Sequence, residues 1–231
     1  LSYTYTIKMK IAAVIVSRKN SERILHKSRK KIKNLSLIER KIIQLKKVKN
    51  LDKIYLGTND ISLKKIAKKY KIYFVKRKEK YCDEKKTNAT EMIKNMLTFV
   101  DADIILWSHA TNPFIDQTLY TDAINLFKKS LKNKDSLFSA TILKNHFWNQ
   151  NKKPLNHNPF AKKHIVAKKL KPIFSQNGGI FIRFKKDMLK DGRFIGKKPI
   201  MFTMNEIQGW DLDYPWQLDL ARVLVKYKHA K

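Results

Sequence analysis

The stretch KIAAVIVSRKNSERILHKS, residues 10–28, decides the fold class of this 231-residue chain. Its apolar run at 11–16 predicts a fully buried strand. The strand leads into a polar loop with four potential donors to an anion: Arg18, Ser21, Arg23 and Lys27. In open α/β sheets, ligands bind outside the carboxyl ends of the strands. The stretch therefore predicts an α/β domain that begins with a phosphate-binding site. The alternative is a solvated basic loop.

Strand-like and helix-like segments alternate along the rest of the chain. Ser36 with Glu39, and Asn88 with Glu91, have the form of capping boxes that open helices. This alternation predicts a mostly parallel, twisted sheet covered by helices on both faces. The expected strands are 11–16, 53–57, 72–75, 103–107, 136–141, 179–184 and 200–204, and the expected helices are 37–48, 61–70, 88–100, 116–131 and 215–228.

The length suits one domain, which we assign to residues 9–231. Residues 1–8 precede a methionine and are interpreted as an N-terminal extension or an expression remnant. Residues 144–172 interrupt the alternation and are rich in Asn, Lys, Pro and His. Their aromatic side chains need partners that cover them, so we expect an inserted arm at about 144–172.

The formal charge of +32 suggests a nucleic-acid-binding protein. Only 8 of the 51 basic residues are arginine, however, and arginine is the residue that base and phosphate contacts favour. A nucleic-acid partner is therefore not expected, although the field attracts nucleotides. The single cysteine, Cys82, builds no disulfide framework, which favours a cytoplasmic location. No apolar run reaches the length of a membrane helix, so no membrane partner is expected.

Two aspartates stand out in a chain with only 19 acidic residues. Asp211 and Asp213 alternate just before the last predicted helix, and in extended backbone their side chains point the same way. Mg²⁺ typically binds one or two carboxylates together with substrate phosphates. The pair predicts a magnesium site. The alternative is a helix N-terminus, where aspartate is favoured by the helix dipole.

Two further segments lie at predicted strand ends. His109 follows a buried strand at the sheet edge, where it either contacts a substrate or has a structural role. Residues 176–179, Gln-Asn-Gly-Gly, either form a turn or allow the backbone to approach a sugar or a base.

In this order, the segments resemble the CMP-sialic acid synthetases, the acylneuraminate cytidylyltransferase family. The family's loop P-A-R-G-G-S-K-R-I-P-G-K-N corresponds to residues 16–28. Both loop glycines, both prolines, the first basic position and the later glycine differ here. The positions that match are Arg18, Ser21, Arg23, Ile24 and Lys27.

The later motifs of the family also have counterparts. Residues 57–60 resemble its S-T-D-D strand end, and 177–181 resemble N-G-A-I-Y. Residues 109–114 resemble Q-P-T-S-P-L, with His109 in place of a substrate-binding glutamine. Residues 210–219 resemble D-I-D-T-P-x-D-L, whose two aspartates hold the metal. Arg77 falls where the family has an Arg-Pro pair, and Thr87 or Asn88 lies near a cytidine-contacting hydroxyl position.

The resemblance implies a three-layer nucleotide-diphosphosugar transferase fold and a homodimer formed through the arm. It implies Mg²⁺-dependent transfer of CMP from CTP to an acidic, sialic-acid-like keto sugar, for surface-glycan synthesis such as lipopolysaccharide or capsule. Arg18, Lys27 and Asp211 would be catalytic, with Asp211 and Asp213 as metal ligands. The nucleotide would bind Arg18, Ser21, Arg23, Lys27, Arg77, Thr87 and Asn88, and the sugar His109, Asn177 and Phe181.

Two alternatives stay open. The sugar could be 3-deoxy-manno-octulosonate or another nonulosonate, because His109 replaces the family's glutamine. The lost loop glycines and the high charge also fit a catalytically degenerate member, or a basic protein that binds anions or nucleic acid.

Overall fold

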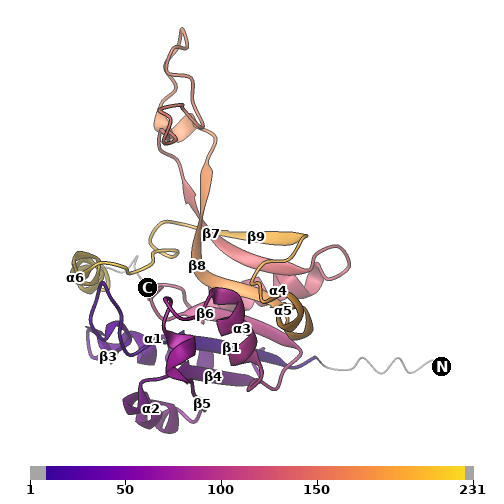
Figure 1. The fold of residues 1–231 in the computed structure, drawn as a ribbon. Helices are drawn as coiled ribbons and strands as arrows, with labels where there is room; N and C mark the ends of the chain where they lie inside the picture. The colour runs from indigo at the N-terminus through magenta and orange to yellow at the C-terminus, as the bar shows by residue number, and fades with distance from the viewer. Residues whose placement is uncertain (1–8, 227–231) are drawn as a thin grey trace, which may run out of the picture.

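The computed structural model describes residues 9–226, and a seven-stranded sheet lies at its centre (Figure 1). The strand order is β5-β4-β1-β6-β8-β7-β9. The interpretation of residues 1–8 lies outside the described residues, as do residues 227–228 of the last predicted helix, and that helix ends at Leu224 in the structure. The strands are β1 Ile11–Ser17, β4 Lys53–Thr58, β5 Tyr73–Lys76, β6 Ile104–His109, β7 Ser136–Leu143, β8 Ile173–Phe184 and β9 Pro199–Met204.

The sheet is mostly parallel, as the alternation predicted. Parallel pairs join β1 to β4 and β6, β4 to β5, and β7 to β9. Only β8 is antiparallel to its neighbours, β6 and β7. The carboxyl ends of β1 and β6 therefore lie at one edge, in register from Ile11 with Ile104 to Val16 with His109.

Helices cover both faces of the sheet and make three layers (Figure 1). Ile11, Ala13 and Ile15 of β1 pack with α1, α2 and α4, whereas Ala12 and Val14 pack with α3 and α5. This period of two on a strand buried on both sides accounts for its continuous apolar run. The helices are α1 Leu37–Lys46, α2 Lys64–Lys69, α3 Ala89–Leu97, α4 Gln117–Lys129, α5 Lys185–Asp191 and α6 Pro215–Leu224.

The two capping boxes have different outcomes. At α1, Ser36 Oγ accepts from Glu39 N at 3.2 Å and Ser36 N donates to Glu39 Oε2 at 3.2 Å, which confirms the box. At α3, Asn88 Oδ1 accepts from Glu91 N at 2.9 Å. The second half of that box is wrong, because the Glu91 carboxylate accepts from the hydroxyl of Thr87 at 2.6 Å instead.

The short strands β2 (Lys31–Ile32) and β3 (Leu35–Ser36) and the helix α5 had no clear signal in the sequence, and β8 is longer than predicted. The hairpin of β2 and β3 is too short to show a period. Helix α5 is mostly charged and ends at Gly192, which adopts φ 66°. Strand β8 begins six residues before the expected 179, because its first half pairs with β7 after a shift of register between Phe138 and Ala140.

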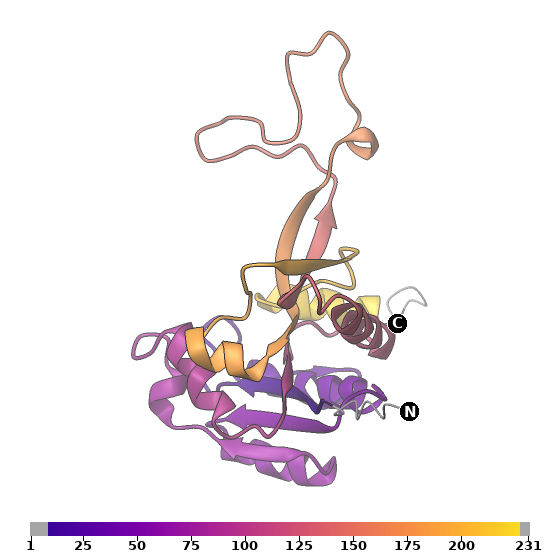
Figure 2. The same ribbon diagram turned by 90° about the vertical axis from the view of Figure 1, so that its right-hand side faces the viewer.

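Residues 144–172 connect β7 to β8 and extend away from the sheet (Figures 1 and 2). They contain one short 3₁₀ helix, η4 (Ala167–Lys169). Inside this arm the ring of His146 lies 4.8 Å from that of His157 and 5.4 Å from that of His164, between centroids. Phe160 is 90% exposed. The fold therefore presents apolar surface on a segment remote from the sheet. Among residues 9–226, none of the helices has the length and apolar character to cross a membrane.

Candidate active site

A cavity of about 480 Å³ opens at the carboxyl ends of β1 and β6. This is the edge at which the first stretch of sequence predicted a ligand. Ten of the twelve predicted site residues line the cavity, although they come from segments up to 195 positions apart: Arg18, Ser21, Arg23, Lys27, Arg77, Thr87, Asn88, His109, Asp211 and Asp213.

The cations of the first loop face carboxylates across this cavity. Lys27 begins the 3₁₀ helix η1 (Lys27–Arg29), and its Nζ donates to Leu212 O at 2.7 Å. The same Nζ lies 3.1 Å from Asp213 Oδ1, and a guanidinium nitrogen of Arg23 lies 3.0 Å from that oxygen. Arg18, next after β1, forms an ion pair of 3.2 Å with Glu84. The loop after β1 is thus joined to a segment near the C-terminus.

The two aspartates are placed by the residue between them. Leu212 is fully buried, and its backbone N–H donates to Thr111 O at 2.9 Å. Asp211 and Asp213 flank this anchor and both line the cavity. Oxygen Oδ1 of Asp211 is buried and has no hydrogen-bond partner among residues 9–226. A buried carboxylate oxygen without a donor suits a cation, since an unpaired buried polar atom is costly.

Asp213 directly precedes the N-cap of α6, as the helix N-terminus interpretation requires, but its carboxylate does not cap the helix. Helix α6 is capped through Gln217, whose Oε1 accepts from Asp213 N at 2.5 Å and Tyr214 N at 2.8 Å. The Asp213 carboxylate pairs with Lys27 and Arg23 instead. The described part of the chain holds no group of three or more metal-binding side chains. Two carboxylates that line one cavity suit Mg²⁺, which typically binds one or two carboxylates and takes its other ligands from substrate phosphates and water.

Arg77, Thr87 and Asn88 lie on the wall formed by β5, η3 (Glu79–Cys82) and the start of α3. Arg77 is 4% exposed, and its guanidinium donates to Tyr81 O. The hydroxyl of Thr87 donates to the Glu91 carboxylate, and the amide oxygen of Asn88 accepts from the backbone N–H of Glu91. Their side chains thus line the cavity while they order the first turn of α3.

His109 ends β6 deep in the cavity. Burial lowers the pKa of its imidazole below the usual value, and Lys41 and Lys27 act in the same direction, against Asp211 and Asp213. A neutral ring at pH 7 donates one hydrogen bond and accepts another. Gly178 lies against the ring with φ 68°, and a Cβ there would be 3.0 Å from His109 Nδ1.

Gly178→Ala is expected to move the His109 ring and to lower stability by about 1 kcal/mol. The loss follows from the positive φ, which a side chain disfavours, and from the close contact with the ring. Urea unfolding and the ¹H–¹⁵N spectrum of the histidine side chains measure the two effects. Gly196→Ala is unsuitable as a control, because its Cβ would meet Asp135. Unchanged stability and an unchanged His109 signal would contradict the close contact between Gly178 and the His109 ring.

The model of one protein family, described as cytidylyltransferase, matches residues 12–214. The chain belongs to the cytidylyltransferase family. The match includes the whole cavity, from β1 to Asp213. No sequence among curated proteins matches this cytidylyltransferase significantly.

Solved structures share the fold of this cytidylyltransferase at low identity. CMP:2-keto-3-deoxy-manno-octonic acid synthetase in complex with CTP has a TM-score of 0.66 at 14% identity, over 94% of this chain and 98% of that one. The 4-diphosphocytidyl-2C-methyl-D-erythritol synthase of Anaerococcus prevotii has a TM-score of 0.69 at 14% identity, over 95% and 97%. A cytidylyltransferase of Leptospira borgpetersenii has a TM-score of 0.53 at 15% identity, over 79% and 63%.

Two predicted sugar-binding residues of the cytidylyltransferase lie outside the cavity lining. The Asn177 side chain is buried, accepting from Ser139 Oγ at 2.5 Å and donating to Thr141 Oγ1 at 3.1 Å. Phe181 is 3% exposed and stacks on Phe194, with 4.6 Å between ring centroids. Phe194 itself lines the cavity. Contacts of Asn177 and Phe181 with a sugar stay predictions.

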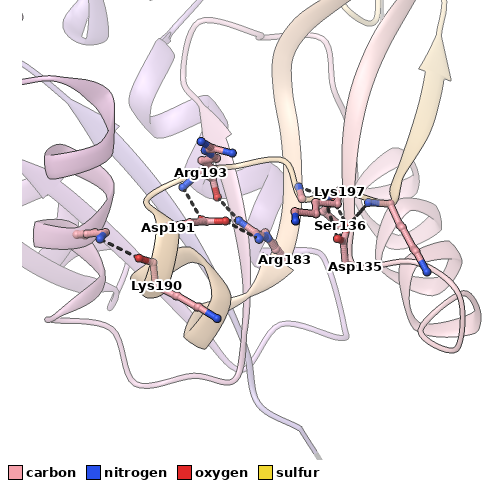
Figure 3. Close-up of polar contacts among 10 residues, drawn as sticks. Asp135, Ser136, Arg183, Lys190, Asp191, Arg193 and Lys197 are labelled. Carbon is pink, nitrogen blue, oxygen red and sulfur yellow. Dashed lines mark hydrogen bonds and ion pairs between the residues drawn. The ribbon is translucent and has the colours of Figure 1, made fainter.

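Phe194 belongs to a loop that two carboxylates hold in place (Figure 3). Asp191 receives two hydrogen bonds from the guanidinium of Arg183, at 2.7 and 2.9 Å. Asp135 accepts from Lys197 N at 2.7 Å, at the other end of the loop. The loop is therefore tied to β8 and to the start of β7 on either side of Phe194. The sequence indicates this loop only weakly, through Gly192 and Gly196.

A buried lysine lies behind the cavity wall of the cytidylyltransferase. Lys41 of α1 is 0% exposed, and its Nζ donates to Asn112 O at 2.9 Å and to Tyr120 Oη at 2.5 Å. Burial lowers the pKa of Lys41 from 10.5 to about 7; Arg40 lowers it further and Asp211 opposes the shift.

The free energy of unfolding is expected to rise with pH between about 7 and 10.5 because of Lys41. The unfolded chain keeps the ordinary lysine pKa of 10.5, so it binds more protons than the folded chain in this window. Lys41→Met removes that contribution. Urea unfolding of both proteins at pH 7, 8 and 9 measures it, and the difference between them is expected to move in favour of the wild type as pH rises. Parallel curves would contradict the prediction.

Proposed function

We propose that this protein transfers CMP from CTP to a hydroxyl of an acidic, sialic-acid-like keto sugar and releases pyrophosphate. One observation carries the proposal: a cavity in which Lys27 and Arg23 meet Asp213 while Asp211 keeps an unpaired, buried oxygen. The cationic side chains that could bind a triphosphate and the carboxylates that could bind a metal ion thus line the same cavity. Membership of the cytidylyltransferase family and the ordered motifs support the same chemistry.

In the proposed reaction, the sugar hydroxyl oxygen attacks the α-phosphorus of CTP and loses its proton to water. The bond from that phosphorus to the β-phosphate oxygen breaks, and pyrophosphate leaves. This chemistry depends on positioning and charge stabilisation more than on covalent help from the protein. Arg18 and Lys27 bind the triphosphate and stabilise the charge that develops on pyrophosphate. Arg18 must first leave Glu84, which pairs with it here.

Asp211 and Asp213 are the proposed ligands of Mg²⁺. When bound, the ion neutralises phosphate charge and orients the reacting groups. Asp213 must exchange at least part of its contact with Lys27 and Arg23, which then become free for phosphate. Ser21 and Arg23 complete the phosphate side, and Arg77, Thr87 and Asn88 form the proposed nucleoside side.

His109 is the proposed sugar contact. A neutral imidazole suits a sugar hydroxyl better than a sugar carboxylate, so the carboxylate needs a cation from the loop. The alternative acceptor is 3-deoxy-manno-octulosonate, which the similar fold of the CMP:2-keto-3-deoxy-manno-octonic acid synthetase makes a reasonable second choice. The homodimer through residues 144–172, the cytoplasmic location and a role in surface-glycan synthesis stay predictions.

A panel of acceptors tests the proposal. Pyrophosphate release from CTP and Mg²⁺ is measured with N-acetylneuraminate, 3-deoxy-manno-octulosonate and 2-C-methyl-D-erythritol 4-phosphate, with ATP, GTP and UTP in parallel. An acidic keto sugar with CTP is expected to give the highest rate. A preference for the sugar-alcohol phosphate would contradict the acceptor class. No turnover, no thermal shift with CTP and salt-sensitive RNA binding would favour the degenerate alternative.

A further inference from the structure

Lys41 takes part in a buried chain of hydrogen bonds that no proposed catalytic step uses. The Nζ group donates to Tyr120 Oη, which lies 2.6 Å from Ser108 Oγ; Ser108 in turn donates to Gly179 O at 2.8 Å. Lys41, Tyr120 and Ser108 are all 0% exposed. The chain joins α1, α4, β6 and β8 directly behind the cavity wall.

The second donor bond of Lys41 reaches the turn after β6. Its Nζ donates to Asn112 O at 2.9 Å, and Gln44, three positions later on α1, donates to Pro113 O at 2.7 Å. Two side chains of one helix therefore hold two successive carbonyl groups of this turn. Within residues 9–226 no backbone N–H donates to either carbonyl, so the two side chains supply the hydrogen bonds that these carbonyls accept.

The same turn fixes the backbone on both sides of Asp211. Thr111 O accepts from Leu212 N at 2.9 Å, and Asn112 Nδ2 donates to Trp210 O at 3.4 Å. Asp211 lies between these two attachment points. A displacement of the turn therefore displaces the carboxylate whose Oδ1 has no partner.

We propose that Lys41 is a positioning residue for nucleotidyl transfer, which holds the 111–113 turn and through it sets the position of the Asp211 carboxylate. The inference rests on the proposed function for its catalytic consequence. Lys41 itself does not line the cavity. Both the ammonium and the neutral amine have at least two N–H bonds, so either form can make the two contacts.

Stability alone is a poor reason for an amine at this place. Burying it costs free energy, and its two hydrogen-bond partners are neutral oxygens rather than carboxylates. A methionine of similar length would fill the space without that cost. What methionine cannot do is donate to Asn112 O, and that contact is the one that leads to Asp211.

The variants Lys41→Met and Lys41→Gln test the inference, and Lys46→Met is the matched control. Lys46 is an exposed lysine on the same helix, and its Nζ donates to Tyr70 O, away from the cavity. Two readouts are compared for each variant: kcat and KM for CTP at saturating acceptor, and Mn²⁺ binding in the presence of CTP, followed by electron paramagnetic resonance. The second readout needs no turnover.

Lys41→Met is expected to lower kcat and to weaken Mn²⁺ binding, each by roughly 10- to 100-fold. Loss of a residue that orients a metal ligand usually has an effect of this size. KM for CTP is expected to stay within about threefold, because the loop cations are unchanged. Lys41→Gln restores one donor and is expected to return to within about fivefold of wild type, the worth of one hydrogen bond. Lys46→Met is expected to match the wild type.

A folded Lys41→Met variant with the Mn²⁺ affinity and kcat of the wild type would overturn the inference. This holds even if the variant unfolds at a lower temperature than the wild type. If Lys41→Met does not fold, Gln44→Leu removes the neighbouring donor and is expected to show the same pattern with a smaller effect. If the wild type binds Mn²⁺ with CTP but transfers CMP to no acceptor, the proposed function fails and the Mn²⁺ titration still decides the role of Lys41. No Mn²⁺ binding by the wild type would overturn both.

Discussion

Asp211→Asn is expected to lower the rate of pyrophosphate release by about 10³-fold, while the variant still binds CTP. The substitution keeps the size of the side chain and its anchored backbone at Leu212. It removes the negative charge from the carboxylate that has a buried, unpaired oxygen. Loss of one electrostatic partner of the transition state costs about 10²–10³ in kcat, and loss of a metal ligand adds to that. Initial rates with CTP and the best acceptor measure the effect.

Asp219→Asn is the matched control for this prediction. Asp219 lies on α6, its side chain is 71% exposed, and it pairs with Arg222 at 2.6 Å. It is expected to keep wild-type activity to within about twofold, because exposed ion pairs contribute little. Equal rates for Asp211→Asn and the wild type would remove the basis for a metal site at this position.

Lys27→Met is expected to lower kcat/KM for CTP by about 10²–10³. The Lys27 side chain is 13% exposed and reaches both Leu212 O and Asp213 in the ligand-free arrangement. In the proposed complex with CTP, the same ammonium contacts the phosphates, where a poorly solvated charge is worth more than in water. Steady-state kinetics over a range of CTP concentrations at low and at physiological salt measure the loss.

Lys30→Met separates this local role from the general field of a chain with charge +32. Lys30 is exposed and three positions from Lys27. Its loss is expected to change the rate by less than about twofold at physiological salt, where exposed charges are screened within about 8 Å. Comparable losses in the two variants would indicate that the overall charge, and not a defined phosphate contact, attracts the nucleotide.

Much of this architecture follows from local patterns. The apolar run of β1 predicted a strand buried on both faces, since no polar side chain interrupts it. Ser36 and Glu39 predicted the start of α1, because their reciprocal hydrogen bonds are local. The alternation of Asp211 with Asp213 predicted a pair of carboxylates beside one another. Such features depend on residues that are near in sequence.

Other features depended on contacts between distant segments. The register shift between Phe138 and Ala140 places Asn177 against Ser139 and Thr141, whereas Phe181 stacks on Phe194, and no local pattern in the sequence indicates either contact. The helix period does indicate that Lys41 is buried. It lies four residues after Leu37 and four before Leu45, both buried, so it occupies an inward position of α1. That position identifies a buried lysine, whereas its partners at Asn112 and Tyr120 come from the fold alone.

The transfer of label from CTP labelled with ³²P at the α-phosphate tests the central claim most directly. The account predicts that an acidic keto sugar acquires the label as a CMP-sugar, that CTP labelled at the γ-phosphate yields labelled pyrophosphate, and that Asp211→Asn slows both by about 10³-fold. Label that stays in CTP with every acceptor, in a protein that is folded and binds CTP, would contradict it.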